Sequence, residues 1–405
     1  MTTPTSQRER IEAIQCAIRD DPGLDGWLFY DFRKSDPLAY RVLLLDPETH
    51  VTRRWYYWVP AEGTPIKLLH RIEPHVLHGL PGEQRSYVSW RDQHAALERI
   101  VGGARRIAMQ YSPLNAIPYV SRVDAGTIEI LKGFGIDIIT SADLVQRFEA
   151  VWTAQQLESH RIAAEGLRRI VDEAFQHVGL SLARGDVLTE YDLQHCIVSR
   201  FDRYGLVTSS RPIVAVNEHS ADPHYGPSPT NSARIRPGDL VLIDLWAKQS
   251  QSDAVYADIT WTGYVGNVVP AHIQQVFHVV KDARNAALEF VTRRVRAGSF
   301  PCGWEVDDAC RGVIVRAGYG DQFVHRTGHS IGVEVHGNGA NIDNLETQDG
   351  RRLMPGTCFS IEPGVYLPGK FGIRSELDVY LSPSDALVFG QPLQSEVVPI
   401  HVPPA

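Results

Sequence analysis

Four acidic residues stand in apolar stretches of sequence where a carboxylate is unfavourable. Asp244 interrupts "DLVLIDLW", Asp258 interrupts "VYADITWTGYVG", Glu362 interrupts "TCFSIEPGVYL" and Glu376 interrupts "GIRSELDVYL". The β-branched and aromatic neighbours predict buried strands, and a buried carboxylate needs positive charge or hydrogen bonds to compensate it. One such acid would more often be a hydrogen-bonded strand end. Four of them in one half of the chain indicate a cation-binding site.

The four acids also fall into two pairs. The polar stretch "AKQSQSDAV" separates the first two, and the turn-forming "PGKFG" separates the last two, so each pair is predicted to lie on a hairpin. Two like charges about 4 Å apart repel by about 4 kcal/mol at an effective dielectric of 20. Since a domain is stable by only about 5–15 kcal/mol, four converging acids call for counter-charge. Two divalent cations would supply it.

A neutral nitrogen ligand is available in "GHSIGVEVHG", where His329 stands between Gly328 and Gly332. Glycines allow close approach of the backbone to a packed site. A lone histidine here would more often be a core residue, but beside four acids we expect a ligand. Four carboxylates and one imidazole without thiolate suit Mn²⁺, Fe²⁺, Co²⁺ or Zn²⁺. Two such ions can share a water and activate a carbonyl, which is hydrolytic chemistry.

Taken in order, Asp244, Asp258, His329, Glu362 and Glu376 resemble the ligand set of the pita-bread metallopeptidases (M24), which include methionine aminopeptidase, aminopeptidase P and prolidase. The segments "GHSIGVEVHG", "SIEPGVY" and "GIRSELDV" resemble those of prolidase and aminopeptidase P. Residues 1–150 resemble, more weakly, the smaller N-terminal domain of these enzymes and of creatinase. Methionine aminopeptidase resembles the catalytic half alone, and creatinase does not keep the ligands.

The resemblance implies dinuclear-metal-dependent hydrolysis of the Xaa-Pro bond in dipeptides, with a metal-bridged hydroxide as the nucleophile. Manganese is the expected metal, and cobalt, zinc or iron stay open. Two alternatives remain: an Xaa-Pro aminopeptidase acting on longer peptides, and a pita-bread protein that lost catalysis and binds a peptide or partner. The resemblance also implies a homodimer.

The same resemblance assigns roles to residues around the metals. Glu362 would also shuttle a proton to the leaving nitrogen. His224, in "NEHSADPHYGP", and His336 would contact the reacting carbonyl. Arg374 would orient Glu376 by a charge-assisted bond. For His325 two alternatives remain: it supports the site, or it lies on the surface.

Further residues bear on specificity. Arg351 or Arg352 would meet the free carboxylate of a dipeptide, with a solvated arginine pair as the alternative. Trp246 stands where the family often has glycine, and Trp261 replaces a common arginine. We expect both tryptophans to lie near the site and to influence which substrate is accepted.

The elements that position these residues can be read from pattern. Residues 1–152 are predicted to form an α/β domain, with a capped helix at Ser6 and strands at 26–31, 40–46, 53–61, 66–72 and 106–111. Residues 153–405 are predicted to be an α+β catalytic domain. Its helices are expected from Thr153, near 188–204, at 270–297 and at 304–317.

Composition narrows the class of protein. Hydrophobic residues make up 43% and charged residues 22%, as in globular proteins, and the net charge of −8 disfavours a nucleic-acid partner. The polar first residues lack the apolar core of a signal peptide, and no apolar run is long enough to span a bilayer. Five cysteines without a CxxC pattern suggest reduced thiols. A cytoplasmic enzyme acting on a peptide, with neither nucleic acid nor membrane as partner, is therefore expected.

Overall fold

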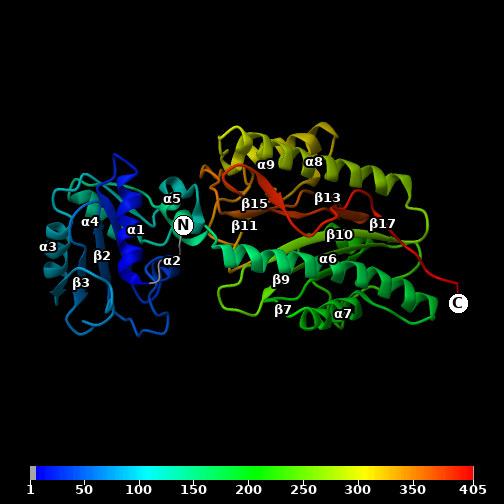
Figure 1. The fold of residues 1–405 in the computed structure, drawn as a ribbon, viewed down its shortest axis with the longest axis horizontal. Coiled ribbons are helices and arrows are strands. Elements are labelled where there is room, and N and C mark those ends of the chain that lie inside the picture. The colour runs from blue at the N-terminus through cyan, green and yellow to red at the C-terminus, as the bar shows by residue number, and fades with distance from the viewer. Residues whose placement is uncertain (1–5, 405) are drawn as a thin grey trace. The chain divides into compact units, whose positions relative to one another are not determined.

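The computed structural model describes residues 6–404. The chain forms two compact units, Met1–Glu149 and Ala150–Ala405. The sequence predicted this boundary three residues later, between residues 152 and 153, where Thr153 caps the long helix of the second unit. Both units mix helices and strands (Figure 1).

The first unit is built around a six-stranded sheet in the order β4-β3-β2-β1-β5-β6. The strands β1 and β2 pair antiparallel, as do β2 and β3, and the other neighbours pair parallel. The strands are β1 Gly26–Asp31, β2 Trp55–Pro60, β3 Ile66–His70, β4 Glu83–Tyr87, β5 Arg106–Met109 and β6 Asp137–Thr140. The helices are α1 Gln7–Arg19, α2 Pro37–Val42, α3 Trp90–Ile100, α4 Ala125–Gly133 and α5 Ala142–Glu149, with short 3₁₀ turns at Pro113–Asn115 and Pro118–Val120.

One predicted strand of this unit is wrong. Residues 40–46 lie in α2 and the turn after it, because Asp36 caps the helix through the Ala39 N–H and Pro37 occupies its first position. The apolar residues of "YRVLLLD" therefore include the buried side of a short helix and of the turn after it. The capping box of Ser6 and Glu9 is confirmed at the start of α1.

The second unit places its strands between two pairs of helices, α6 with α7 and α8 with α9 (Figure 1). One sheet runs β17-β10-β9-β7, with β8 also paired to β9, and a second runs β11-β12-β15-β16; β13 and β14 form a separate hairpin. The strands are β7 Leu206–Val207, β8 Ile213–Val216, β9 Leu240–Gln249, β10 Ala257–Val265, β11 Ser330–Ile331, β12 Cys358–Ile361, β13 Gly364–Leu367, β14 Phe371–Arg374, β15 Leu377–Leu381, β16 Ala386–Val388 and β17 Val398–Ile400.

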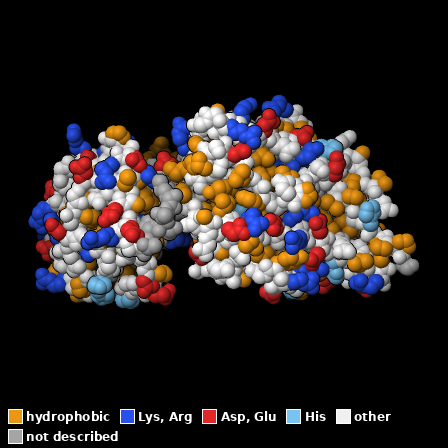
Figure 2. Space-filling view, in the orientation of Figure 1, with side chains coloured by type: hydrophobic (Ala, Val, Ile, Leu, Met, Phe, Trp, Pro, Cys, Tyr) orange, Lys and Arg blue, Asp and Glu red, His pale blue; other side chains and the backbone are white. Residues whose placement is uncertain are grey.

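The four predicted helices of the second unit are present. They are α6 Ala154–Ala183, α7 Glu190–Arg203, α8 Ala271–Arg296 and α9 Gly303–Arg316, and short 3₁₀ turns lie at Asn217–Ala221 and Gly320–Gln322. The predicted Thr153–Gln156 capping box opens α6. Among residues 6–404, no helix is long and apolar enough to cross a membrane. Basic and acidic side chains are interspersed on the face drawn in Figure 2.

Candidate metal centre

The first two acids lie on one face of the β9–β10 hairpin. Asp244 pairs with Thr260 across the ladder, and Asp258 pairs with Trp246. Because side chains alternate along a strand, Asp244 and Trp246 share a face with Asp258 and Thr260. Both carboxylates are largely buried, 7% and 4% exposed. The predicted presentation of the first pair from a hairpin is confirmed.

The second pair lies at breaks between strands. Glu362 follows β12 and Glu376 precedes β15, directly beyond the paired residues Ile361 and Leu377. The chain passes at that point from the second sheet into the β13–β14 hairpin, whose first pair includes Arg374. The two glutamates thus occupy the gap between two ladders, where the backbone no longer alternates regularly. The sequence predicted them within strands instead.

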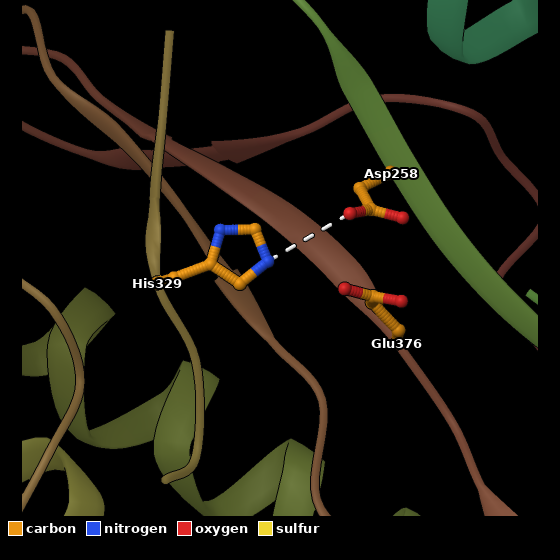
Figure 3. A group of neighbouring side chains, drawn as sticks. All are labelled: Asp258, His329 and Glu376. Atoms are coloured by element: carbon orange, nitrogen blue, oxygen red, sulfur yellow. Dashed lines mark ion pairs between the residues drawn. The ribbon is translucent and has the colours of Figure 1, made fainter. Parts of the chain in front are cut away.

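His329 reaches the acids from the segment before β11. A Cβ on Gly328 would lie 1.9 Å from the Ser360 carbonyl oxygen, so only glycine permits this close packing. The His329 Nε2 atom lies 3.7 Å from Asp258 Oδ2 and 3.4 Å from Glu362 Oε1. Single ligand atoms of Asp258, His329 and Glu376 all lie within 4.8 Å of one another (Figure 3).

The donor set fits divalent cations. Asp244 Oδ1, Asp258 Oδ1 and Glu376 Oε1 are buried oxygens without a hydrogen-bond partner within residues 6–404. Burial, together with the neighbouring carboxylates, raises the pKa of Asp258 and of Glu376 well above their ordinary values. Burial also lowers the pKa of His329, which keeps a neutral imidazole. Unpartnered oxygens beside a neutral nitrogen are what two cations would require.

Arg374 supplies positive charge to the acids, but differently from the prediction. Its guanidinium forms an ion pair with Asp244 and donates from Nε to Thr260 Oγ1 at 3.0 Å. The Thr260 hydroxyl in turn donates to Glu376 Oε2 at 2.8 Å. Arg374 therefore reaches Glu376 through Thr260. It also donates to the Tyr366 hydroxyl at 3.0 Å.

The five donors line a cavity of about 670 Å³. The other side chains around it are Ser210, Ile213, Pro223, His224, Trp246, Val324, His325, Arg326, Val335, His336, Glu346 and Arg374. The predicted carbonyl-contacting residues His224 and His336 are both exposed on its wall. The His336 ring packs edge-on against His329, with centroids 4.2 Å apart. It comes from an irregular segment, although "VEVHG" alternates as a strand would.

His325 is half-buried and has a supporting position. Its Nε2 lies 2.8 Å from the Tyr366 hydroxyl, and that hydroxyl accepts a hydrogen bond from Arg374. Burial and the charge of Arg374 lower the pKa of His325 to about 3, so the ring is neutral. His325 therefore fixes Tyr366, and Tyr366 fixes Arg374.

Arg351 and Arg352 lie elsewhere. Arg351 is 2% exposed and makes two bonds to Asp349, from Nε at 2.9 Å and from Nη2 at 2.6 Å. Arg352 donates to the Phe300 carbonyl at 3.0 Å. Neither side chain is among those that line the cavity. Their predicted contact with a substrate carboxylate has no support in this arrangement.

Trp246 and Trp261 point to opposite faces of the sheet. Trp246 lines the cavity, whereas Trp261 is 7% exposed and faces α6, where the Arg168 guanidinium carbon lies 3.7 Å from its ring centroid. Trp261 is an odd number of residues from Asp258 on β10, so it points to the opposite side of the sheet. The expectation that both tryptophans lie near the site is wrong for Trp261.

Several supporting residues have no signal in the sequence. The Asp378 carboxylate accepts the Asp258 backbone N–H at 2.7 Å. Glu190 is fully buried and accepts two backbone N–H groups and the Tyr225 hydroxyl (2.7 Å), with His219 Nδ1 2.9 Å away. That network holds the segment that carries His224. Glu190 also reads as an ordinary first-turn helix residue, so only the tertiary contacts reveal its role.

Comparison with known proteins identifies the family of the chain. Residues 155–383 match metallopeptidase family M24. A probable dipeptidase PepE of Mycobacterium tuberculosis is 26% identical over 349 residues, 85% of each chain. An Xaa-Pro dipeptidase of Lactobacillus delbrueckii subsp. lactis is 30% identical over 247 residues, 58% of each chain. The crystal structure of dipeptidase PepE from Mycobacterium ulcerans superposes with a TM-score of 0.67 at 25% identity, covering 96% of this chain and 97% of the other.

Proposed function

The chain belongs to metallopeptidase family M24, and we propose that it hydrolyses the Xaa-Pro bond of dipeptides with two divalent metal ions. Its second unit has the mixed α/β pita-bread fold of solved M24 enzymes. The observation that carries the proposal is the convergence of five donors, three of them with unpartnered buried oxygens, on one cavity.

Asp244, Asp258, His329, Glu362 and Glu376 would hold the two ions, with Mn²⁺ expected first. When bound, the ions polarise the scissile carbonyl and acidify a water. Arg374 and Thr260 keep Asp244 and Glu376 oriented toward the cavity.

Glu362 is suited to move the proton. Burial and the charge of Asp244 raise its pKa, Arg374 opposes this, and the resulting pKa is about 7. That value holds for the metal-free chain and bound cations would lower it, so the proposed proton transfer rests on the place of Glu362 among the donors on the cavity wall. The water oxygen adds to the carbonyl carbon, the C–N bond breaks, and Glu362 passes the water's proton to the departing proline nitrogen. His224 and His336 would donate hydrogen bonds to the carbonyl oxygen as it gains charge.

A proline substrate fits this chemistry because its amide has no N–H and its ring fixes the backbone. A site that recognises the amide N–H would gain nothing from such a bond. The proposed reaction needs attack at the carbonyl and a proton for the departing nitrogen, and neither step uses an amide N–H.

The dipeptide form is supported by the names of two relatives and by a second cation on the cavity wall. Arg326 is half-buried there, next to His325, and its charge faces the same cavity as the donors. We propose that Arg326, in place of Arg351 or Arg352, attracts the substrate carboxylate. On this basis Arg326→Ala raises KM for a dipeptide more than it lowers kcat.

The test is hydrolysis of Leu-Pro beside Leu-Pro-Gly-Gly by metal-stripped protein to which Mn²⁺ is returned. Cleavage of the dipeptide alone supports the proposal. Cleavage of the longer peptide makes the protein an Xaa-Pro aminopeptidase. If the metal binds and neither is cut, the protein is a binding member of the family. Sedimentation of the same sample tests the proposed homodimer, and fractionation of the source cells tests the cytoplasmic location.

A further inference from the structure

We propose that Trp246 is a wall that selects the size of the residue before the scissile bond. The inference rests on the proposed hydrolysis at the cavity and adds a specificity-determining residue to it. It concerns the first residue of the substrate, whatever residue follows it.

Trp246 lies between two of the proposed metal ligands. It is directly opposite Asp258 in the β9–β10 ladder and two residues from Asp244 on its own strand, on the same face. Those positions separate the backbone atoms by roughly 5 and 7 Å. The half-buried indole therefore rises beside the carboxylates.

The indole is held in place. Its Nε1–H donates to Ser210 Oγ at 3.2 Å, which ties β9 to the segment before β8. Behind it lies an apolar cluster that includes Trp152, Tyr256 and Ile331. The hydrogen bond and the packing against this cluster favour one position of the indole.

The substrate's first residue is the part that meets this boundary. The carbonyl under attack must lie against the metal donors, and the proline nitrogen must face Glu362, which supplies its proton. The first residue then extends toward Asp244 and Asp258, the two ligands that flank Trp246. Its side chain begins one atom from the carbonyl carbon and would meet the apolar part of the lining, which includes Trp246, Ile213 and Val335. These three apolar side chains form its pocket.

Trp261 provides a matched control. It is a tryptophan on the neighbouring strand of the same sheet, but it packs against Arg168 on the opposite face. Trp261→Phe should lower the stability of the sheet and leave the cavity unchanged. A change in substrate size would follow only from substitution of Trp246.

The experiment measures kcat/KM for Ala-Pro and Phe-Pro, and for Ala-Ala and Phe-Ala, with Mn²⁺-loaded wild type, Trp246→Ala and Trp261→Phe. Metal content and Tm are recorded for each. One methylene group of misfit changes kcat/KM by about 10–200-fold, so we expect Trp246→Ala to raise the Phe to Ala ratio by at least about tenfold. Trp261→Phe should leave that ratio unchanged. If Trp246→Ala does not fold, Trp246→Leu is used and should raise the ratio less.

Either an unchanged or a lower ratio in the folded Trp246 variant overturns the inference, as does an equal rise in Trp261→Phe. The proposed function fails separately. If wild type cuts Ala-Ala and not Ala-Pro, Xaa-Pro specificity is lost while the ratio of Phe-Ala to Ala-Ala still tests Trp246. If wild type cuts none of the four dipeptides, the proposed function and this inference both fail.

Discussion

Removal of the metal ions should make the stability of the protein depend on pH through Glu362. Its pKa of about 7 in the folded chain lies above the ordinary value of 4.5, chiefly because the side chain is buried. The unfolded chain therefore releases this proton more easily than the folded chain. Below about pH 4.5 the carboxyl is protonated in both states and contributes nothing. Between about pH 4.5 and about pH 7 the folded state loses stability, and the loss is complete once the pH has risen through the folded pKa.

The magnitude follows from the two pKa values. A difference of about 2.5 pKa units corresponds to about 3 kcal/mol of unfolding free energy. For a domain of about 150–250 residues, this lowers Tm by roughly 6–12 °C. Bound cations would remove the effect, because they stabilise the ionised carboxylate in the folded state only.

The assay is thermal unfolding in chelator of wild type and Glu362→Gln, at about pH 5, near the start of the predicted loss, and at about pH 8, where the loss is complete. Glutamine cannot titrate there, so the variant should lack this part of the pH dependence. Buried histidines such as His160, whose pKa burial lowers to about 4, affect both proteins equally and cancel in the comparison. Equal pH dependence of the two proteins would refute the reasoning, and so would a wild-type Tm that metal return leaves unchanged at the higher pH.

Three further predictions concern individual side chains. Asp258→Asn should lose at least one of two bound Mn²⁺ ions by elemental analysis and about 100-fold or more in kcat, and two retained ions with full activity would remove Asp258 from the ligand set. His336→Ala should lower kcat by about 100-fold with unchanged metal content, as expected for loss of a hydrogen-bond donor to the developing oxyanion; wild-type kcat/KM would show that it does not contact the reacting group. Arg351→Ala should destabilise the protein by about 3–5 kcal/mol in denaturant unfolding, because the buried Asp349 carboxylate loses its ion-pair partner and keeps only the backbone N–H groups of Asn341 and Arg351. Arg352→Ala is its control, and a specific rise of KM in Arg351→Ala with unchanged stability would return Arg351 to the substrate site.

Local sequence predicted much of this protein because the relevant signals are short. A capping box such as Thr153 with Gln156 needs only four residues to define a helix start. An acid within a run of strand-forming residues can be recognised as unusual from its immediate neighbours alone. The donors on β9 and β10 could be paired for the same reason, since the polar hairpin between them is contiguous in sequence.

The partners of those donors could be assigned only in three dimensions. Arg374 was expected to serve its neighbour Glu376, but it pairs with Asp244, 130 residues away, and no local spacing encodes that contact. Trp246 and Trp261 look equivalent in sequence, yet strand register turns one toward the cavity and the other toward α6. Sequence therefore determined which side chains could bind metal. The tertiary structure decided which face, partner and cavity each one meets, because side-chain alternation and long-range packing set these together.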